Sequence, residues 1–149
     1  MCKVAIIMGS KSDLPIMQKA ADFLKEQNIQ SQVFIASAHR TPKKVKTIAE
    51  EIETDYDCVI AGAGMAAHLP GVIASLVTKP VIGVPINASA LNGLDALLAI
   101  VQMPSGIPVA TVAVDGAKNA AILAMQILSL KDKAICEKYQ QFRKKLEES

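Results

Sequence analysis

Both histidines of this 149-residue chain lie in polar stretches that directly follow apolar runs. His39 belongs to the stretch Ser37-Ala-His-Arg-Thr-Pro42, and His68 stands near the end of a stretch rich in glycine and alanine. An unperturbed imidazole changes its charge at about pH 6.5, so each ring is able to carry a proton at physiological pH. His39 is therefore a candidate proton carrier, and His68 is a candidate for ligand binding. For either residue, a purely structural hydrogen bond is the alternative.

The stretch Gly9-Ser-Lys-Ser-Asp13 has the parts of an anion-binding loop. Gly9 permits close backbone approach, Ser10 and Ser12 offer hydroxyl groups, and free amides of a following helix point outward. It is not a P-loop, because the Gly-Lys-Ser/Thr ending is absent. Asp13 would repel a phosphate, so we expect it to cap the next helix or to accept hydrogen bonds from sugar hydroxyls. An ordinary turn with an aspartate cap is the alternative.

Arg40, next to His39, is able to supply the positive charge that fixes a phosphate. Hydrogen bonds from a guanidinium to a phosphate are charge-assisted and stronger than neutral ones. A surface arginine beside the start of a helix is the alternative.

A third stretch, residues 62–71, superficially matches a dinucleotide-binding fingerprint through Gly62-x-Gly64-x-x-Ala67. It follows the third apolar run rather than the first, and no Asp or Glu ends the next one. We interpret it as a wall of small residues whose backbone amides face a small carboxylate, followed by a helix interrupted at Pro70-Gly71. No cluster of His, Cys, Asp and Glu has metal-ligand spacing, so we expect no metal site.

These stretches fall between elements that alternate regularly along the chain. Short apolar runs predict five strands, and segments with helical periodicity separate them. Such alternation indicates an α/β fold: a three-layer α/β/α sandwich around a five-stranded parallel sheet, for which we expect the flavodoxin-like order 2-1-3-4-5. Ligands bind such sheets at the carboxyl ends of the strands, where the polar stretches lie. The predicted strands are Val4–Met8, Gln32–Ser37, Cys58–Ala61, Pro80–Val84 and Pro108–Val114.

The predicted helices show their apolar faces in the sequence. Two helix starts are predicted from a capping residue followed by an early proline: Asp13 with Pro15, and Thr41 with Pro42. A short helix is expected over Val72–Val77, and one over Asn119–Leu130 is apolar enough to be buried on most sides. Apolar residues at i, i+3, i+4 and i+7 mark three further faces: Met17, Ala20, Ala21, Leu24; Val45, Ile48, Ala49, Ile52; and Leu94, Leu97, Leu98, Val101.

The length predicts a single domain, residues 1–149, and the composition excludes several classes. Hydrophobic residues make up 51% and charged residues 20%, which excludes a disordered chain. A net charge of +2 and 3% aromatic residues give no case for a nucleic acid or membrane partner. Three widely spaced cysteines and the lack of a long apolar run favour a cytoplasmic protein without disulfides.

The segment 131–149 lies outside the five strand–helix units and predicts a charged C-terminal helix. Its apolar stripe is Ile135, Tyr139, Phe142 and Leu146. A stripe of four large residues has to cover something. The pattern favours neither the chain's own domain nor a neighbouring subunit.

Taken together, the stretches resemble the N5-carboxyaminoimidazole ribonucleotide mutase family, also described as the catalytic subunit of phosphoribosylaminoimidazole carboxylase. Each stretch is weak singly, but the set spans nearly the whole chain in the family's order and spacing. Met65 stands where the family usually has glycine, and Leu14 where many members have Trp. The matching stretches are Met8-Gly-Ser-Lys-Ser-Asp13, Ser37-Ala-His-Arg-Thr-Pro42, Ala61-Gly-Ala-Gly64, Ala66-Ala-His-Leu-Pro-Gly71, Ile100-Val-Gln-Met-Pro104 and Gly106-Ile-Pro-Val-Ala110.

The resemblance implies an isomerase of purine biosynthesis that moves a carboxylate within N5-carboxyaminoimidazole ribonucleotide. It implies no ATP, metal or organic cofactor. It also implies a homo-octamer with sites at subunit contacts, in which the C-terminal helix reaches a neighbour. His39 would be the catalytic proton carrier. The implied substrate-binding residues are Ser10, Ser12, Ser37 and Arg40 for the phosphate, Asp13 for the ribose, Gly64, Met65, Ala66 and Ala67 for the carboxylate, and His68 beside them.

Other functions stay open at this point. Direct carboxylation of aminoimidazole ribonucleotide by carbon dioxide is the other reaction class of the same family. The fingerprint at Gly62 leaves a nucleotide-dependent oxidoreductase as a different class. A non-catalytic domain of flavodoxin-like shape is the third alternative, although a receiver-type domain would need clustered acidic residues where only Asp13 stands.

Overall fold

A computed structural model describes all 149 residues and contains one five-stranded parallel sheet. The strand order is β2-β1-β3-β4-β5, which confirms the expected order. None of the helices combines the length and the apolar composition that a membrane span requires. The strands are β1 (Lys3–Met8), β2 (Gln30–Ile35), β3 (Cys58–Gly64), β4 (Val81–Ile86) and β5 (Ala110–Thr111). The helices are η1 (Lys11–Asp13), α1 (Leu14–Glu26), α2 (Pro42–Asp55), α3 (Leu69–Leu76), α4 (Leu94–Val101), α5 (Ala117–Ser129) and α6 (Lys133–Glu147).

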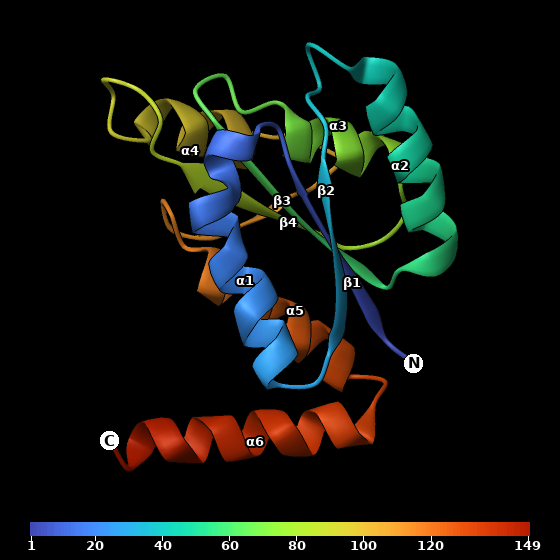
Figure 1. Cartoon of the computed structure of the whole chain (residues 1–149), viewed down its shortest axis with the longest axis vertical. Helices are drawn as coiled ribbons and strands as arrows, with labels where there is room; N and C mark the ends of the chain where they lie inside the picture. Colours follow the sequence, from blue (N-terminus) through green and yellow to red (C-terminus); the bar gives the residue numbers. More distant parts are fainter.

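The central strands are continuous apolar runs because both of their faces are covered. Side chains alternate along β1: Ile6 joins the core under α1 and α5, whereas Ile7 joins the core under α2, α3 and α4. Ile6 lies in register with Val33 of β2 and with Ile60 of β3. The two cores make the three-layer sandwich, and the loops that follow β1, β2 and β3 meet at one end of it (Figure 1).

The fifth strand is much shorter than the seven-residue run Pro108–Val114 predicts. Only Ala110 and Thr111 pair with β4 in the ladder. Pro108 has no N–H to donate, and the segment lies at an edge of the sheet, where Ala110 is exposed. The apolar run therefore marks the right place but overstates the length of regular pairing.

Helix α4 turns its predicted apolar face outward. Leu94, Leu98 and Val101 are about half exposed, whereas Ala96 and Ile100 are fully buried against the sheet. The close approach of Ile100 to Gly83 decides which face of α4 is buried, because a Cβ added at Gly83 would lie 2.3 Å from Cγ2 of Ile100. A strip of exposed leucines is left on the surface.

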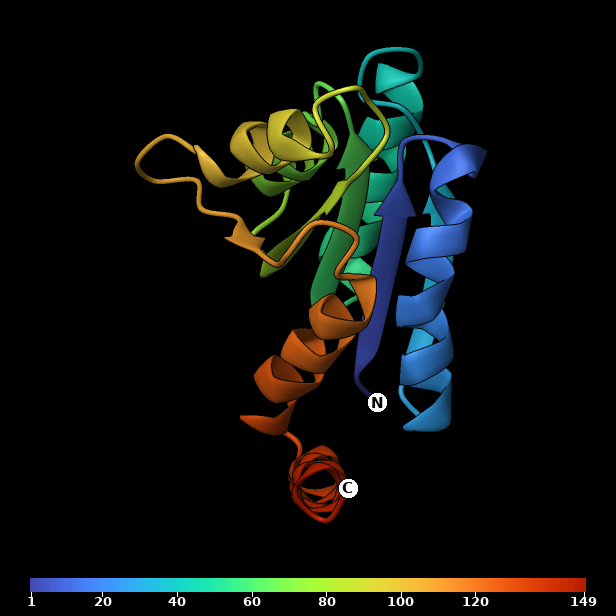
Figure 2. The same ribbon diagram turned by 90° about the vertical axis from the view of Figure 1, so that its left-hand side faces the viewer.

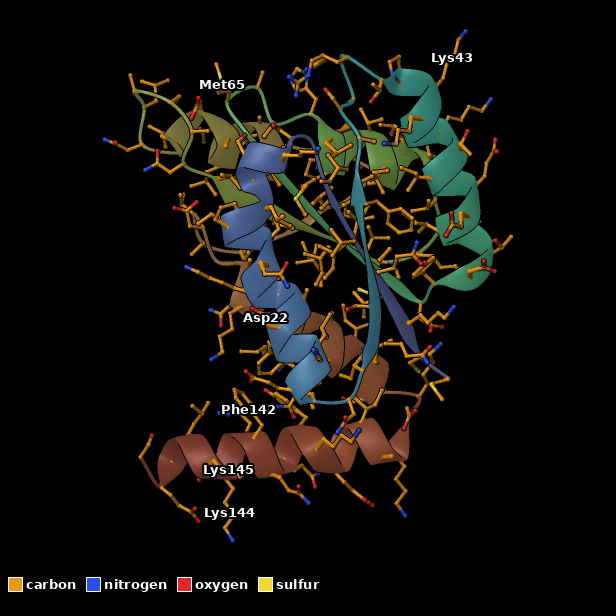
Figure 3. All side chains as sticks on the ribbon, viewed as in Figure 1. Asp22, Lys43, Met65, Phe142, Lys144 and Lys145 are labelled. Carbon is orange, nitrogen blue, oxygen red and sulfur yellow. The ribbon has the colours of Figure 1, made fainter.

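Helix α6 lies across one end of the molecule, beneath α1 and α5, as Figures 1 and 2 show. Asp132 caps it by accepting the Ile135 N–H at 3.1 Å. Ile135 is buried in the core, and the ring of Phe142 packs edge-on against Phe23 with centroids 5.3 Å apart. Phe142 points toward α1 while Lys144 and Lys145 point away (Figure 3). The first part of the stripe thus packs on its own domain, and Leu146 at its end is 54% exposed.

Candidate active site

The polar stretches come together in one cavity of about 440 Å³ at the carboxyl ends of β1, β2 and β3. All predicted site residues except Ala67 line it. Three of the lining segments are more than twenty residues apart in the sequence, and the parallel sheet brings them to one edge. The lining residues are Gly9, Ser10, Ser12, Asp13, Ser37, Ala38, His39, Arg40, Ala63, Gly64, Met65, Ala66, His68, Leu69 and Ala88.

The loop after β1 forms a turn of 3₁₀ helix before α1 begins. The Asp13 carboxylate accepts the Ser10 N–H at 3.1 Å, and the Ser10 hydroxyl oxygen accepts the Ser12 N–H at 3.3 Å. The two serine hydroxyl groups lie 3.0 Å apart. The expected cap of the following helix is wrong: the Asp13 side chain makes no capping bond to α1, because the inserted turn uses it to close a capping box.

Asp13 is the one buried charged residue of the chain, with 6% of its surface exposed. Burial raises the pKa of its carboxyl above the ordinary value, against the opposing influences of the Ser10 N–H and the Arg40 charge. The carboxylate is thus held in the site at a cost to folding, and polar hydrogens of a ligand would relieve that cost.

The loop after β2 places Arg40 over the loop after β1. Arg40 Nη2 donates to the Gly9 carbonyl oxygen at 3.2 Å, and the Arg40 N–H donates to the Ser37 hydroxyl oxygen at 3.1 Å. Thr41 stands at the start of α2, but its hydroxyl oxygen accepts the Ser37 N–H and makes no capping bond to the helix. The expected threonine cap is therefore wrong, because that hydroxyl group closes the turn that presents Ser37 and Arg40.

The two histidines, 29 residues apart in the sequence, meet in the cavity. Nε2 of His39 lies 2.8 Å from Nδ1 of His68, which is hydrogen-bond distance. The ring planes are close to perpendicular, at 80°, with centroids 4.8 Å apart. Both residues are exposed to the cavity, so both are accessible to a ligand.

The glycine- and alanine-rich stretch forms one wall of the cavity. Met65 has a left-handed backbone, with φ of 53°, and its side chain is 59% exposed at the end of a loop (Figure 3). The Ala67 N–H donates to the Met65 carbonyl at 2.9 Å, and the His68 N–H donates to the Ala66 carbonyl at 2.8 Å. These two N–H groups are therefore already hydrogen-bonded within the turn.

Ala67 accordingly lies outside the cavity lining and is buried, with 1% exposure. The helix after the wall begins at Leu69 and carries Pro70 in its first turn. The expected interruption at Pro70-Gly71 is wrong, because a proline is tolerated where the helix has no amide partners anyway.

A family model described as AIR carboxylase matches residues 3–149 of this sequence. The chain belongs to the AIR carboxylase family. The resemblance seen in the sequence is thereby confirmed over nearly the whole chain.

Relatives of this AIR carboxylase family member carry a common name, N5-carboxyaminoimidazole ribonucleotide mutase. The relative from Pyrococcus horikoshii is 58% identical over 142 residues, covering 95% of this chain and 80% of the relative. The one from Escherichia coli K12 is 51% identical over 145 residues, covering 95% of this chain and 86% of the relative. Among solved structures, Treponema denticola PurE superposes with a TM-score of 0.92 at 33% identity, covering 99% of this chain and 93% of that one.

The dinucleotide fingerprint does not describe this AIR carboxylase site. Gly62 lies within strand β3, and a Cβ added there would meet Met17 Sδ at 2.3 Å. Gly64 is needed for a similar reason, because its Cβ would lie 2.6 Å from that of Ala88. These glycines allow side chains to pack against the sheet, whereas the fingerprint needs them in the turn that meets a pyrophosphate.

Four lining residues were not predicted from the sequence as site residues: Ala38, Ala63, Leu69 and Ala88. Ala38, Ala63 and Leu69 lie inside the predicted stretches, but their apolar side chains carry no group that signals a site. Ala88 comes from the loop after β4, and only the position of that loop at the same end of the sheet signals it. No group of three or more His, Cys, Asp or Glu residues is arranged to hold a metal ion.

Proposed function

We propose that this protein converts N5-carboxyaminoimidazole ribonucleotide to 4-carboxy-5-aminoimidazole ribonucleotide, an isomerisation within purine biosynthesis. The observation that carries the proposal is the single cavity that joins three hydroxyl groups, a guanidinium and an imidazole pair. It occurs in a chain 51–58% identical to relatives named for this reaction.

The phosphate of the substrate binds between the loops after β1 and β2 in this proposal. Ser10, Ser12 and Ser37 line the cavity there, and Arg40 brings the charge that a phosphate requires. The Arg40 side chain reaches the Gly9 carbonyl, so the cation lies directly beside the serine loop. Asp13, buried behind that loop, accepts the ribose hydroxyl groups. Its negative charge suits hydroxyl donors and keeps the phosphate on the other side.

The chemistry needs a held carboxylate and one group that handles protons. The carbamate of the substrate loses carbon dioxide readily, which leaves an enamine-like carbon, C4, as the nucleophile. A closed site keeps the carbon dioxide beside that carbon and replaces a bimolecular encounter. His39 protonates the departing nitrogen and later removes the hydrogen from C4. The carboxylate faces the wall of Gly64, Met65 and Ala66, where His68 also lies.

One assay separates this function from direct carboxylation. The protein is incubated with the N5-carboxy compound at low bicarbonate, and separately with aminoimidazole ribonucleotide at high bicarbonate. We expect rapid formation of the 4-carboxy product only in the first incubation. Turnover of the second mixture alone would assign the other reaction class, and no turnover in either would reject the proposal.

We also propose that the enzyme is a cytoplasmic homo-octamer with sites at subunit contacts. The outward strip around α4 supports an assembly, because Leu91, Leu94, Leu98 and Val101 are each 47–61% exposed. Contiguous apolar surface of this kind marks protein–protein contacts. The cysteines are all free thiols, which fits a reducing compartment.

Light scattering tests the assembly directly. We expect a species of eight times the chain mass of 15.8 kDa. Truncation before Lys131 should weaken it, because it removes the exposed end of the α6 stripe at Leu146, whereas Ile135 and Phe142 already pack on their own domain. Leu98→Lys is the matched variant on α4, where a charge on an exposed position leaves the single chain intact. A wild-type protein of the mass of one chain would contradict the assembly, and a large species unchanged in both variants would show that neither surface holds it together.

A further inference from the structure

The hydrogen bond between the two imidazole rings has only two possible polarities, and they differ in consequence. A neutral imidazole has one donor and one acceptor nitrogen, so one ring must donate and the other accept. Nε2 of His39 and Nδ1 of His68 are the paired atoms, at 2.8 Å. Nδ1 of His39 makes no hydrogen bond to any other residue, and His39 is an exposed residue that lines the cavity. It is therefore the one ring nitrogen of His39 that a substrate can use.

Only one polarity leaves that nitrogen reactive. If His68 donated, a neutral His39 would carry its single proton on Nδ1. Releasing that proton would create an imidazolate, and no lone pair on Nδ1 could accept another. If His39 donates through Nε2–H, Nδ1 carries a free lone pair, which takes up a proton and gives it back without disturbing the bond.

We propose that His68 is a positioning residue whose Nδ1 accepts the Nε2–H of His39, making Nδ1 of His39 the nitrogen that exchanges protons with the substrate. This inference rests on the function proposed above. The acid form is His39 protonated on both nitrogens. Its Nδ1 proton moves to the departing nitrogen as the N–C bond to the carboxylate breaks. After the C–C bond forms, the C4 proton moves to Nδ1, which restores the acid form.

The pair keeps the same donor and acceptor throughout this cycle. Nε2–H of His39 donates to His68 in the neutral state and in the imidazolium state. The bond becomes charge-assisted when His39 is protonated, and it holds the ring orientation in both states. His68 needs to remain neutral, and its own proton then sits on Nε2.

Nitrogen NMR of the intact protein without substrate tests the polarity. The chain has only two histidines, so the spectrum of uniformly ¹⁵N-labelled protein contains four ring nitrogens, and His68→Asn assigns them. At mildly alkaline pH we expect a protonated Nε2 and a bare Nδ1 on His39, with a scalar coupling across the bond to Nδ1 of His68. A proton on Nδ1 of His39, or no coupling between the rings, overturns the proposal. Because no substrate is present, this result is independent of the proposed reaction.

Kinetics of matched variants test the consequence. In His68→Asn, the side-chain oxygen takes the approximate place of Nδ1 and still accepts a hydrogen bond, whereas His68→Leu has no acceptor. We expect kcat to fall about 10- to 100-fold in His68→Leu, the effect of losing one bond to a charged group, and less than tenfold in His68→Asn. KM should change little in both. Equal losses of kcat in the two variants, or a loss confined to KM, overturns the proposal, while an inactive wild type rejects the proposed function instead.

Discussion

The two ends of the central sheet each hold an aspartate with a shifted pKa, and the shifts run in opposite directions. At the carboxyl end, burial raises the pKa of Asp13, and no salt bridge compensates it. At the amino end, burial acts on Asp57 in the same sense, but hydrogen bonds from the Lys131 ammonium and the Lys3 N–H outweigh it and lower its pKa. The carboxyl end therefore holds a buried carboxylate that destabilises the fold, Asp13, whereas the carboxylate at the amino end, Asp57, is paired with a lysine.

The contrast extends to the backbone and to packing. Both ends contain a left-handed residue, but Met65 at the carboxyl end has a bulky side chain, whereas Asn28 at the amino end is of a type that tolerates this conformation. The amino end is also closed by the aromatic contact between Phe23 and Phe142. Buried charge and backbone strain commonly gather where a protein binds or reacts. The carboxyl end thus bears features that reduce stability, and α6 helps to restore stability at the other end.

The largest effect is expected at the carboxyl end, from His39→Asn. Asparagine keeps some hydrogen-bonding ability but cannot carry a proton at neutral pH. Turnover should fall by at least about 10²–10⁴-fold, the usual contribution of a general acid–base group. Substrate affinity, measured by calorimetry, and the thermal midpoint should remain near wild type. Near-normal turnover would remove His39 from its role.

Arg40→Ala should weaken substrate binding about 10- to 100-fold, the value of one charge-assisted contact. The dephosphorylated nucleoside serves as the control ligand, because it lacks the group that Arg40 holds. It should bind wild type and variant about equally weakly. A comparable loss with the nucleoside would place Arg40 against another part of the substrate.

At the amino end, Phe142→Ala should reduce the free energy of unfolding by about 2 kcal/mol, less than for a fully buried ring because Phe142 is half-buried. Urea denaturation of the wild type and the variant measures this difference in the free energy of unfolding. Leu146→Ala is the matched control on the same stripe, and at 54% exposure it should cost less than about 0.5 kcal/mol in a single chain. A larger, concentration-dependent loss for Leu146→Ala would instead show that a neighbouring subunit covers this end.

Asp13→Asn and Asp57→Asn should change stability with opposite signs. A carboxyl whose pKa is raised by folding contributes stability in acid that is lost as pH rises, so Asp13 destabilises the neutral protein. Asparagine still accepts the Ser10 N–H, so Asp13→Asn should raise the thermal midpoint at pH 7 by about 2–4 °C, or ~1 kcal/mol. The gain should shrink as the pH is lowered and Asp13 becomes protonated.

For Asp57 the lowered pKa means that stability is present above its unfolded pKa and is lost as pH falls through the folded value. Asp57→Asn should therefore lower the midpoint at pH 7, by less than about 1 kcal/mol because Lys131 is exposed, and the deficit should shrink in acid. Equal signs for the two variants at pH 7 would contradict the contrast between the two ends.

The smallest expected effect comes from Met65→Gly, which should stabilise the protein by about 0.5–1 kcal/mol. Glycine adopts a positive φ without a steric penalty, although it adds entropy to the unfolded chain. Met65→Val is the control, since a β-branched residue resists this conformation and should destabilise by a similar amount. Chemical denaturation of the three proteins measures both, and a loss of stability in the glycine variant would show that Met65 is unstrained.

Much of the fold was predictable from the sequence because its signals are local. Continuous apolar runs such as Val4–Met8 predict strands buried on both faces, and the alternation with helices predicts a parallel sheet. That rule also predicts where the loops must gather, so ten of the eleven expected site residues do line one cavity. The exception, Ala67, depends on a turn in which its amide is already bonded to the Met65 carbonyl.

Other features depend on distances between segments remote in the sequence, which no local pattern contains. The bond between His39 and His68 exists because strands β2 and β3 both flank β1 and end at the same edge. The outward face of α4 follows from the absence of a side chain at Gly83, where Ile100 packs instead. Periodicity tells which residues share a face of a helix, but the tertiary structure decides which face is buried, because burial depends on the space that the opposing surface leaves.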